Sequence, residues 1–193
     1  GKTGAGADHV NFSLRAAGEA VGLFATNGAL INGIVFPAQQ EGVSEGRFPD
    51  GTTNVFAFPR TASPGASNWR QLTDIVINEV LTHTDEPLED AIELYNLTDQ
   101  PIDIGGWWLS DDPGTLQKYQ IPLSTVVPPH GFKVIYEIVF TNRETAAVPF
   151  ALSSQGDEVV LSAFANNTFT GWRAKVDFGA AANGVSFGRY VTS

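Results

Sequence analysis

Residues 73–112 read TDIVINEVLTHTDEPLEDAIELYNLTDQPIDIGGWWLSDD, and this stretch determines the fold class of the chain. Within it, residues 90–96 alternate, with Ile92 and Leu94 on one face and more polar side chains on the other. A period of two marks a β-strand whose two faces meet different surroundings. The Thr-Asp-Gln-Pro sequence at 98–101 is turn chemistry, after which the alternation resumes. The stretch therefore predicts two or three consecutive β-strands.

Two adjacent tryptophans lie near the end of this stretch. Side chains of neighbouring strand residues point to opposite faces, so Trp107 and Trp108 should meet different surroundings. We expect Trp107, which shares a face with Leu109, to pack in the core. Trp108 and, in the preceding linker, Trp69 are the aromatic side chains better placed to face a ligand, although packing is the more common role of such residues.

Strand-like segments continue on both sides of this stretch, and no amphipathic helix of ten or more residues is recognisable. The Asn27-Gly28 dipeptide favours a hairpin with a type I′ turn. Residues 141–148 are the one place where we expect a helical turn. The chain is therefore predicted to be all-β, with strands spaced as in an antiparallel β-sandwich. The further strands are expected at residues 12–14, 20–26, 30–36, 44–48, 54–58, 116–123, 132–136, 157–164, 173–178 and 184–191.

The composition limits the classes of function. At 193 residues, 42% of them hydrophobic and 17% charged, the chain is long enough for one large or two small packed domains. Its formal net charge of -10 repels nucleic acid and anionic membrane surfaces. Because cysteine is absent, disulfides, thiol catalysis and thiolate metal sites are excluded. No apolar run approaches the ~20 residues needed to span a bilayer, so membrane insertion is not expected.

The chain contains an internal repeat. FSLRAAGEAVGL at residues 12–23 aligns with FALSSQGDEVVL at 150–161, and FPAQQEGVSEGRF at 36–48 aligns with FGAAANGVSFGRY at 178–190. Only the later copy has strands of its own in front of it, and the TASPGASN segment between the copies reads as a linker. The expected parts are residues 1–70, the later half of one unit plus the linker, and residues 71–193, a nearly complete unit.

These residues resemble the lamin tail domain, an immunoglobulin-like antiparallel β-sandwich that also occurs in secreted and surface-attached bacterial proteins. The resemblance rests on INEV at 77–80, IELYN at 92–96, GWWLSDD at 106–112 and GDEVVL at 156–161. It implies a non-catalytic binding, adhesion or spacer module of a larger bacterial protein, located outside the cell or on its surface. The absence of methionine, even at position 1, leads us to expect a processed product or a piece of something longer.

Two other functions remain open. One is a self-associating structural subunit, joined into a fibre or layer by strand donation, and the other is an accessory domain of a secreted nuclease or hydrolase. The later copy lacks the family's closing strand, and a sandwich without an edge strand exposes unpaired backbone groups that invite a protein partner or a second copy. We predict that a strand of the earlier copy completes it, in the same chain or in a neighbour. That strand comprises Asn54, Val55, Phe56, Ala57 and Phe58.

No set of residues predicts catalysis, and we expect no enzyme activity. The histidines, His9, His83 and His130, are far apart in the sequence, and no nucleophile motif accompanies them. Arg47 and Arg189 occupy equivalent positions in the two copies, where each is expected to brace a turn or to pair with an acid.

Acidic residues crowd two predicted loops, and their oxygen atoms could hold calcium, which takes about six to eight oxygen ligands. Solvated loops explain the same pattern, because the regular spacing of a calcium-binding loop is absent. No other cofactor is expected. The possible calcium ligands are Asp85, Glu86, Glu89, Asp90, Asp111 and Asp112.

Overall fold

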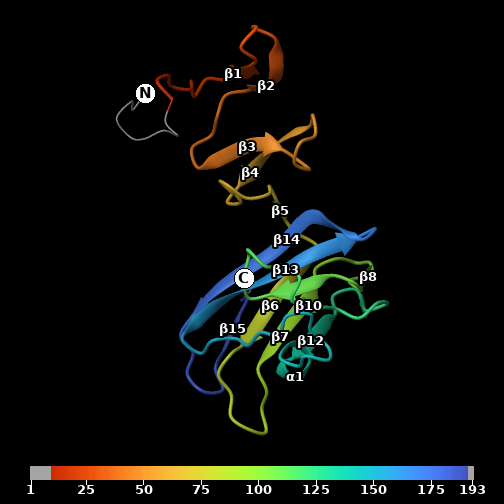
Figure 1. The fold of residues 1–193 in the computed structure, drawn as a ribbon. Coiled ribbons are helices and arrows are strands. Elements are labelled where there is room, and N and C mark those ends of the chain that lie inside the picture. Colours follow the sequence, from red (N-terminus) through yellow and green to blue (C-terminus); the bar gives the residue numbers. More distant parts are fainter. Residues whose placement is uncertain (1–9, 191–193) are drawn as a thin grey trace. The chain divides into compact units, whose positions relative to one another are not determined.

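The computed structural model describes residues 10–190 and divides the chain into two compact units, one up to Asn68 and the other from Trp69 onward. Both units are built from β-strands, and the described residues contain one short helix, α1 (Glu137–Phe140) (Figure 1). Within residues 10–190, no helix is long and apolar enough to cross a membrane.

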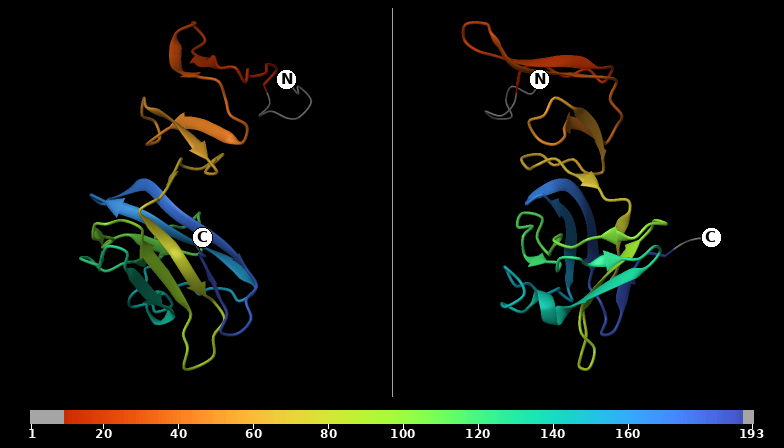
Figure 2. Two further views of the ribbon diagram at one scale, coloured as in Figure 1. Left: turned by 180° about the vertical axis from the view of Figure 1, so that it is seen from behind. Right: turned by 90° about the vertical axis from the view of Figure 1, so that its right-hand side faces the viewer.

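The second unit is a two-layered β-sandwich (Figure 2). One layer is a five-stranded sheet in the order β10-β9-β13-β14-β5. Its neighbouring strands are antiparallel, except that β14 and β5 run parallel. The strands are β5 (Arg70–Gln71), β9 (Trp108–Ser110), β10 (Tyr119–Gln120), β13 (Gly156–Ala165) and β14 (Thr168–Gly179).

The other layer is a four-stranded antiparallel sheet in the order β12-β7-β6-β15, and a separate two-stranded ribbon joins β8 to β11. The sheet order places β6, an early strand of the unit, directly beside β15, the last strand described. The strands are β6 (Ile75–Leu81), β7 (Ala91–Asn96), β8 (Ile102–Asp103), β11 (Val126–Val127), β12 (Phe132–Tyr136) and β15 (Ser186–Gly188).

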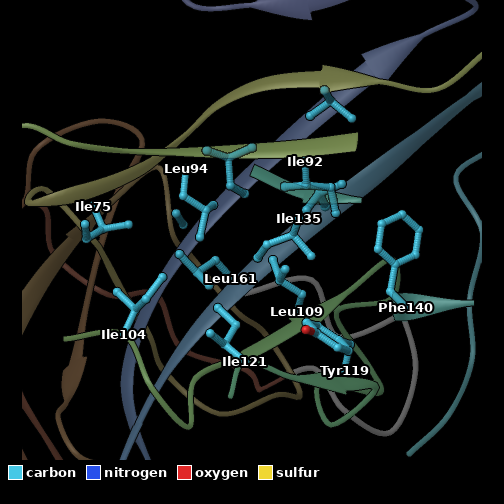
Figure 3. Packing of buried hydrophobic residues seen from close by; sticks show 14 of the residues in the cluster. Ile75, Ile92, Leu94, Ile104, Leu109, Tyr119, Ile121, Ile135, Phe140 and Leu161 are labelled. Atoms are coloured by element: carbon cyan, nitrogen blue, oxygen red, sulfur yellow. The ribbon is translucent and has the colours of Figure 1, made fainter. Parts of the chain in front are cut away.

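The core lies between the two sheets and follows from the period-two alternation (Figure 3). Ile92 and Leu94 of β7 point inward and are fully buried, whereas Glu93 and Tyr95 lie half-buried on the outer face. Leu161 of β13 joins the same cluster from the opposite layer. Burial of each such apolar side chain stabilises the fold by about 1.5–3 kcal/mol, so the facing layers hold together. The predicted all-β antiparallel sandwich is confirmed.

One polar side chain, that of Asn96, is fully buried at the end of β7. Its Nδ2 donates to the carbonyl oxygens of Gln100 at 2.7 Å and of Val127 and Pro128 at 3.1 Å each. Its Oδ1 accepts from the N–H of Thr98 at 2.9 Å. Since a buried polar group is costly unless it is hydrogen-bonded, these bonds explain how an amide is tolerated here. Asn96 ties the turn after β7 to the segment after β11.

The first unit contains two antiparallel hairpins. Phe58 is almost fully buried in the later hairpin, where its ring meets that of Phe48 edge to face at 6.2 Å between centroids. The earlier hairpin has no comparable core, and its large apolar side chains are mostly exposed. The strands are β1 (Glu19–Phe24) paired with β2 (Leu30–Phe36), and β3 (Val43–Arg47) paired with β4 (Val55–Pro59).

The β1–β2 hairpin of the first unit and the β13–β14 hairpin of the second have the same cross-strand register. Glu19 lies opposite Phe36 in one, and Asp157 lies opposite Phe178 in the other. The next four residue pairs also follow in step, down to Leu23 in β1 and its counterpart in β13. The two hairpins diverge only beyond these pairs, where the β13–β14 hairpin is longer.

The turns that lead into these two hairpins also match. Gly18 and Gly156 have positive φ angles of +102° and +112°, and a Cβ at either position would press against the backbone at the end of the partner strand. The N–H of Arg15 donates to the Glu19 carboxylate at 3.1 Å. The N–H of Ser153 donates to the carboxylate of the residue after Gly156 at the same distance. The aligned sequences therefore adopt the same local conformation.

The turn expected at Asn27-Gly28 differs from the prediction. A type I′ turn needs positive φ at both central residues, but Gly28 has a φ of +83° and Asn27 is not in that region. The N–H of Gly28 instead bonds the carbonyl of Ala25 at 2.9 Å, and the Asn27 side chain accepts from the N–H of Ala29 at 3.0 Å. The hairpin forms as expected, with a longer loop.

The helical turn is also displaced from its predicted place at residues 141–148. The helix α1 follows directly after β12, in a segment whose sequence continues the apolar run of that strand. Phe140 at its end is fully buried and stacks on Phe150, with ring centroids 4.8 Å apart. Packing of this ring against the core favours the helix over a longer strand.

The strand predicted as a donor is hydrogen-bonded within its own unit. The segment from Val55 to Phe58 lies in β4 and pairs with β3 of its own unit. Among the strands that the structure describes, β15 has β6 as its hydrogen-bonded neighbour and forms an edge of its sheet. The β3–β4 hairpin closes over a short loop, which costs less chain entropy than pairing across the linker. Donation of this strand, to the second unit or to a neighbouring chain, stays a prediction.

Candidate binding groove

A groove lies on the outer face of the four-stranded sheet, the face that points away from the core. Its volume is about 560 Å³, and side chains from β6, β7, β12, α1 and the β6–β7 loop line it. The loop contributes an apolar wall through Pro87 and Leu88, and α1 contributes Ile138. The two strand-borne carboxylates are those of Glu79 and Glu93.

The register of the sheet arranges the side chains of this face in rows. Leu81, Ala91 and Tyr136 lie opposite one another on β6, β7 and β12 and form an apolar row. In the next row, Glu79 lies opposite Glu93. Tyr136 is about half exposed, so the apolar row is open to solvent. The groove therefore combines apolar walls with a pair of facing carboxylates.

A third row, of aromatic side chains, borders the carboxylates on their other side. Tyr95 of β7 lies opposite Phe132 of β12, and their rings stack with centroids 4.6 Å apart. Phe132 is exposed over about half of its surface. The carboxylate pair therefore lies between two rows that offer apolar contact.

The carboxylate pair is only partly compensated. Like charges directly opposite one another on neighbouring strands destabilise a sheet. The Nδ2 of Asn78 donates to Glu93 at 2.7 Å. No lysine or arginine is among the described residues that line the groove. The register shift between Ile77 and Glu79 places Asn78 out of step with β7.

Two further carboxylates, those of Asp90 and Glu137, belong to residues adjacent in sequence to residues that line the groove. Burial raises the pKa of Asp90, although the hydroxyl of Thr84, which donates to it at 2.8 Å, and the neighbouring His83 lower it. Burial also raises the pKa of Glu137, and the carboxylates of Asp90 and Glu89 raise it further by repulsion. Burial is therefore the main cause of both shifts, and repulsion between carboxylates adds to it only at Glu137.

The loop between β6 and β7 is held in place by the segment between β14 and β15. The Nδ1 of His83 lies 2.9 Å from the carbonyl oxygen of Ala181, and the N–H of Gly184 donates to the carbonyl of His83 at 2.7 Å. The side-chain amide of Asn183 donates to the carboxylate of Asp85. The loop wall of the groove is therefore anchored on its far side.

The structure does not gather the possible calcium ligands into a metal site. Within residues 10–190, no three metal-ligating side chains are close enough together to hold an ion. Asp111 pairs with Lys118 at 2.5 Å, and Asp112 accepts from the N–H of Gly114 at 2.7 Å, which lowers the pKa of Asp112. Asp85 and Asp90 have the partners described above, Glu89 lines the groove, and Glu86 is exposed.

The tryptophans lie elsewhere in the second unit. Trp107 packs against the core as predicted. Trp108 is half-buried, its ring meets that of Phe164 edge to face at 6.2 Å between centroids, and its Nε1 is buried. Trp69 is half-buried as well. Neither Trp69 nor Trp108 lines the groove, and their role toward a ligand stays a prediction.

The histidines and the repeated arginines have structural partners. His130 Nε2 lies 2.8 Å from Asp99 at the surface, far in sequence from the anchored His83, while His9 falls outside the described residues. The guanidinium of Arg47 donates to the carbonyl of Gly33 at 2.9 Å, and the Nε of Arg189 donates to the carbonyl of Ile77 at 2.9 Å. Arg47 also donates to the carbonyl of Thr52 in the turn after β3, which is one of the two roles expected, whereas Arg189 bonds the backbone of strand β6 and not a turn.

Sequence reasoning missed the groove. Glu79 and Glu93 were visible as polar positions in strands, but their opposition depends on the register and on the shift at Asn78. A strand pairing that assigns Ile77 opposite Leu94 and then allows one extra residue would have found it. No signal in the sequence alone requires that extra residue.

Comparison with known families agrees with this architecture. The family model described as Lamin Tail Domain matches residues 70–177, which include β5 to β13 and most of β14. A search of the curated proteins and a search of the solved structures gave no match. The match covers more than half of the 193 residues, and the matched region forms the immunoglobulin-like sandwich expected of this non-enzymatic module. The chain belongs to the lamin tail domain family.

Proposed function

We propose that the second unit is a non-catalytic binding module that holds a segment of a partner protein in the groove on the outer face of β6, β7 and β12. The observation that carries this proposal is the opposition of Glu79 and Glu93 between two apolar rows. A lysine or arginine side chain placed between these carboxylates would relieve their repulsion. Apolar neighbours of that cation would cover Leu81, Val134 and Tyr136.

A polypeptide fits this surface better than the other large ligands. The formal net charge of -10 opposes nucleic acid and anionic lipid. An exposed aromatic and aliphatic surface with a few fixed charges is typical of protein recognition, where the apolar contacts provide affinity and the charges provide specificity. We further propose that the module belongs to a larger bacterial protein outside the cell or on its surface, as the family resemblance suggests.

The test is selection of peptides on the full chain from a displayed library of random twelve-residue sequences. We expect enrichment of peptides that carry a lysine or arginine between apolar residues. Binding of such a peptide should weaken at least tenfold in the Glu79→Gln Glu93→Gln double variant and should fall with added salt. Glu144→Gln, an exposed acid outside the groove, is the matched control and should bind as the wild type does.

Two outcomes would contradict the proposal. One is a set of selected peptides without a basic residue. The other is a double variant that binds the selected peptide as tightly as the Glu144→Gln control.

A further inference from the structure

The first unit carries a groove of its own. Its volume is about 400 Å³, and it opens on the face of the β1–β2 hairpin that presents Val21, Ile34 and Phe36, with Leu14 beside them. A two-stranded hairpin is marginally stable by itself in water. Contiguous apolar side chains open to solvent can mark an interaction surface.

The second unit shows how the same face is used when it is covered. Leu23 of β1 is 62% exposed, whereas Leu161 at the same register position of β13 is fully buried. Phe12 is 53% exposed, whereas Phe150, its counterpart in the aligned sequence, is 6% exposed. Equal register with opposite burial means that the first hairpin lacks a layer that the second hairpin has.

The missing layer can be identified from the second unit. There, the side chains of β13 and β14 share one core cluster with those of β6, β7 and β12. These three strands belong to the opening part of the unit, before Phe150. We propose that the apolar face of the β1–β2 hairpin docks the opening strands of a lamin tail unit, which complete it as a second sandwich.

The carboxylate of Glu45 indicates which kind of side chain the partner should present. Glu45 of β3 takes the position that Phe187 holds in β15, where Phe187 stacks on Phe178 at 5.9 Å between centroids. Glu45 lines the groove of the first unit, and its Oε2 is buried without a hydrogen-bond partner among residues 10–190. A buried carboxylate oxygen needs a donor. The natural partner therefore presents a basic or other donating side chain opposite Glu45, among apolar inward-facing residues.

The probe for this surface is the opening part of the second unit itself. Residues 69–149, fused to a soluble carrier protein, are titrated into the full chain, and binding is followed by fluorescence anisotropy. We expect saturable binding that Leu23→Asp weakens at least tenfold, because a charge would be buried in the new core. Val35→Asp is the matched control, since Val35 lies on the opposite face and its counterpart, Asp177, is exposed.

A third variant tests the role of Glu45. Glu45→Phe installs the residue that the second unit has at this position, so it should bind the probe more tightly than the wild type does. If the fused probe does not stay in solution, the same residues placed ahead of Val10 in one chain serve instead. Slower amide exchange in β1 and β2, lost in Leu23→Asp and kept in Val35→Asp, is then the expected result.

The proposal is overturned if neither the wild type nor Glu45→Phe binds the probe. It is also overturned if the affinity of Leu23→Asp for the probe is within twofold of the wild-type affinity, because the probe would then be exchanging with β13 and β14 of the second unit. A Glu45→Phe variant that binds the probe no more tightly than the wild type overturns it as well. In the single-chain experiment, unchanged amide exchange in β1 and β2 would also overturn the proposal. Because these variants lie in the first unit, their outcome is independent of the peptide groove on β6, β7 and β12.

Discussion

Glu79 and Glu93 lie directly opposite each other on β6 and β7, in a groove whose described lining contains no lysine or arginine. Replacing Glu79 by glutamine removes the repulsion, so the free energy of unfolding at pH 7 should rise by about 0.2–1 kcal/mol. Urea unfolding at low and high salt measures this difference in the free energy of unfolding, which should be smaller at high salt. The exposed control, Glu144→Gln, should stay within about 0.5 kcal/mol of the wild type. A Glu79→Gln protein that is less stable than the wild type would contradict this prediction.

Glu137 should make stability depend on pH in the acidic range. Burial and the repulsion from Asp90 raise its pKa above the ordinary 4.5, so the folded protein binds a proton that the unfolded chain has already released. The free energy of unfolding should therefore fall as the pH rises from 4.5 through the raised pKa. Glu137→Gln should remove this contribution and be the more stable protein at pH 7.

The measurement is thermal or urea unfolding of the wild type and Glu137→Gln between pH 4 and pH 7. The difference between the two proteins should be smallest at the acidic end and should level off above the raised pKa. A difference that grows as the pH falls would show the opposite sign and would exclude this explanation.

Leu161 and Leu23 form a matched pair for testing the role of burial. Leu161→Ala removes a fully buried side chain from the sandwich core and should lower the free energy of unfolding by about 2–5 kcal/mol. Leu23→Ala changes the same register position in the first unit, where the side chain is exposed, and should have an effect within about 0.5 kcal/mol. Equal losses from both substitutions in urea unfolding would mean that Leu23 is covered in solution.

Asn96 should be sensitive to truncation although it is polar. Asn96→Ala leaves three carbonyl oxygens in and near the core without their donor, and this should cost about 1–3 kcal/mol. Exposed Gln117 serves as the control, since Gln117→Ala should be nearly neutral. Amide exchange near residues 97–100 and 127–128 should accelerate only in Asn96→Ala. An unchanged amide exchange rate at these residues would mean that Asn96 does not stabilise the turn after β7.

The layers of the sandwich were predictable because they depend on local pattern. The alternation through Ile92 and Leu94 placed β7 and its buried face correctly, and the aligned glycines Gly18 and Gly156 marked equivalent turns. The position of α1 was not predictable, because the stacking of Phe140 on a residue ten positions later favours it. The local conformational preferences of residues 137–140 carry no information about a contact with Phe150.

The candidate groove lay beyond sequence reasoning for a similar reason. Each glutamate of the pair is an ordinary outward-facing strand residue by itself. Their opposition depends on a one-residue shift beside Asn78, and a shift of one residue changes which side chains share a face. The acidic loop residues were predicted as possible calcium ligands because they are neighbours in sequence. In the fold they have separate partners.

The pairing of β15 with β6 has a consequence for how the chain is made. Arg189 bonds the carbonyl of Ile77 across 112 positions of sequence, so the early strand has no neighbour on that edge until the last strand has emerged from the ribosome. The apolar inner face of β6, β7 and β12 likewise stays uncovered until β13 and β14 have been synthesised, because residues of all five strands share one core cluster. A translational pause shortly before residue 150 would prolong that wait and should increase misassembly.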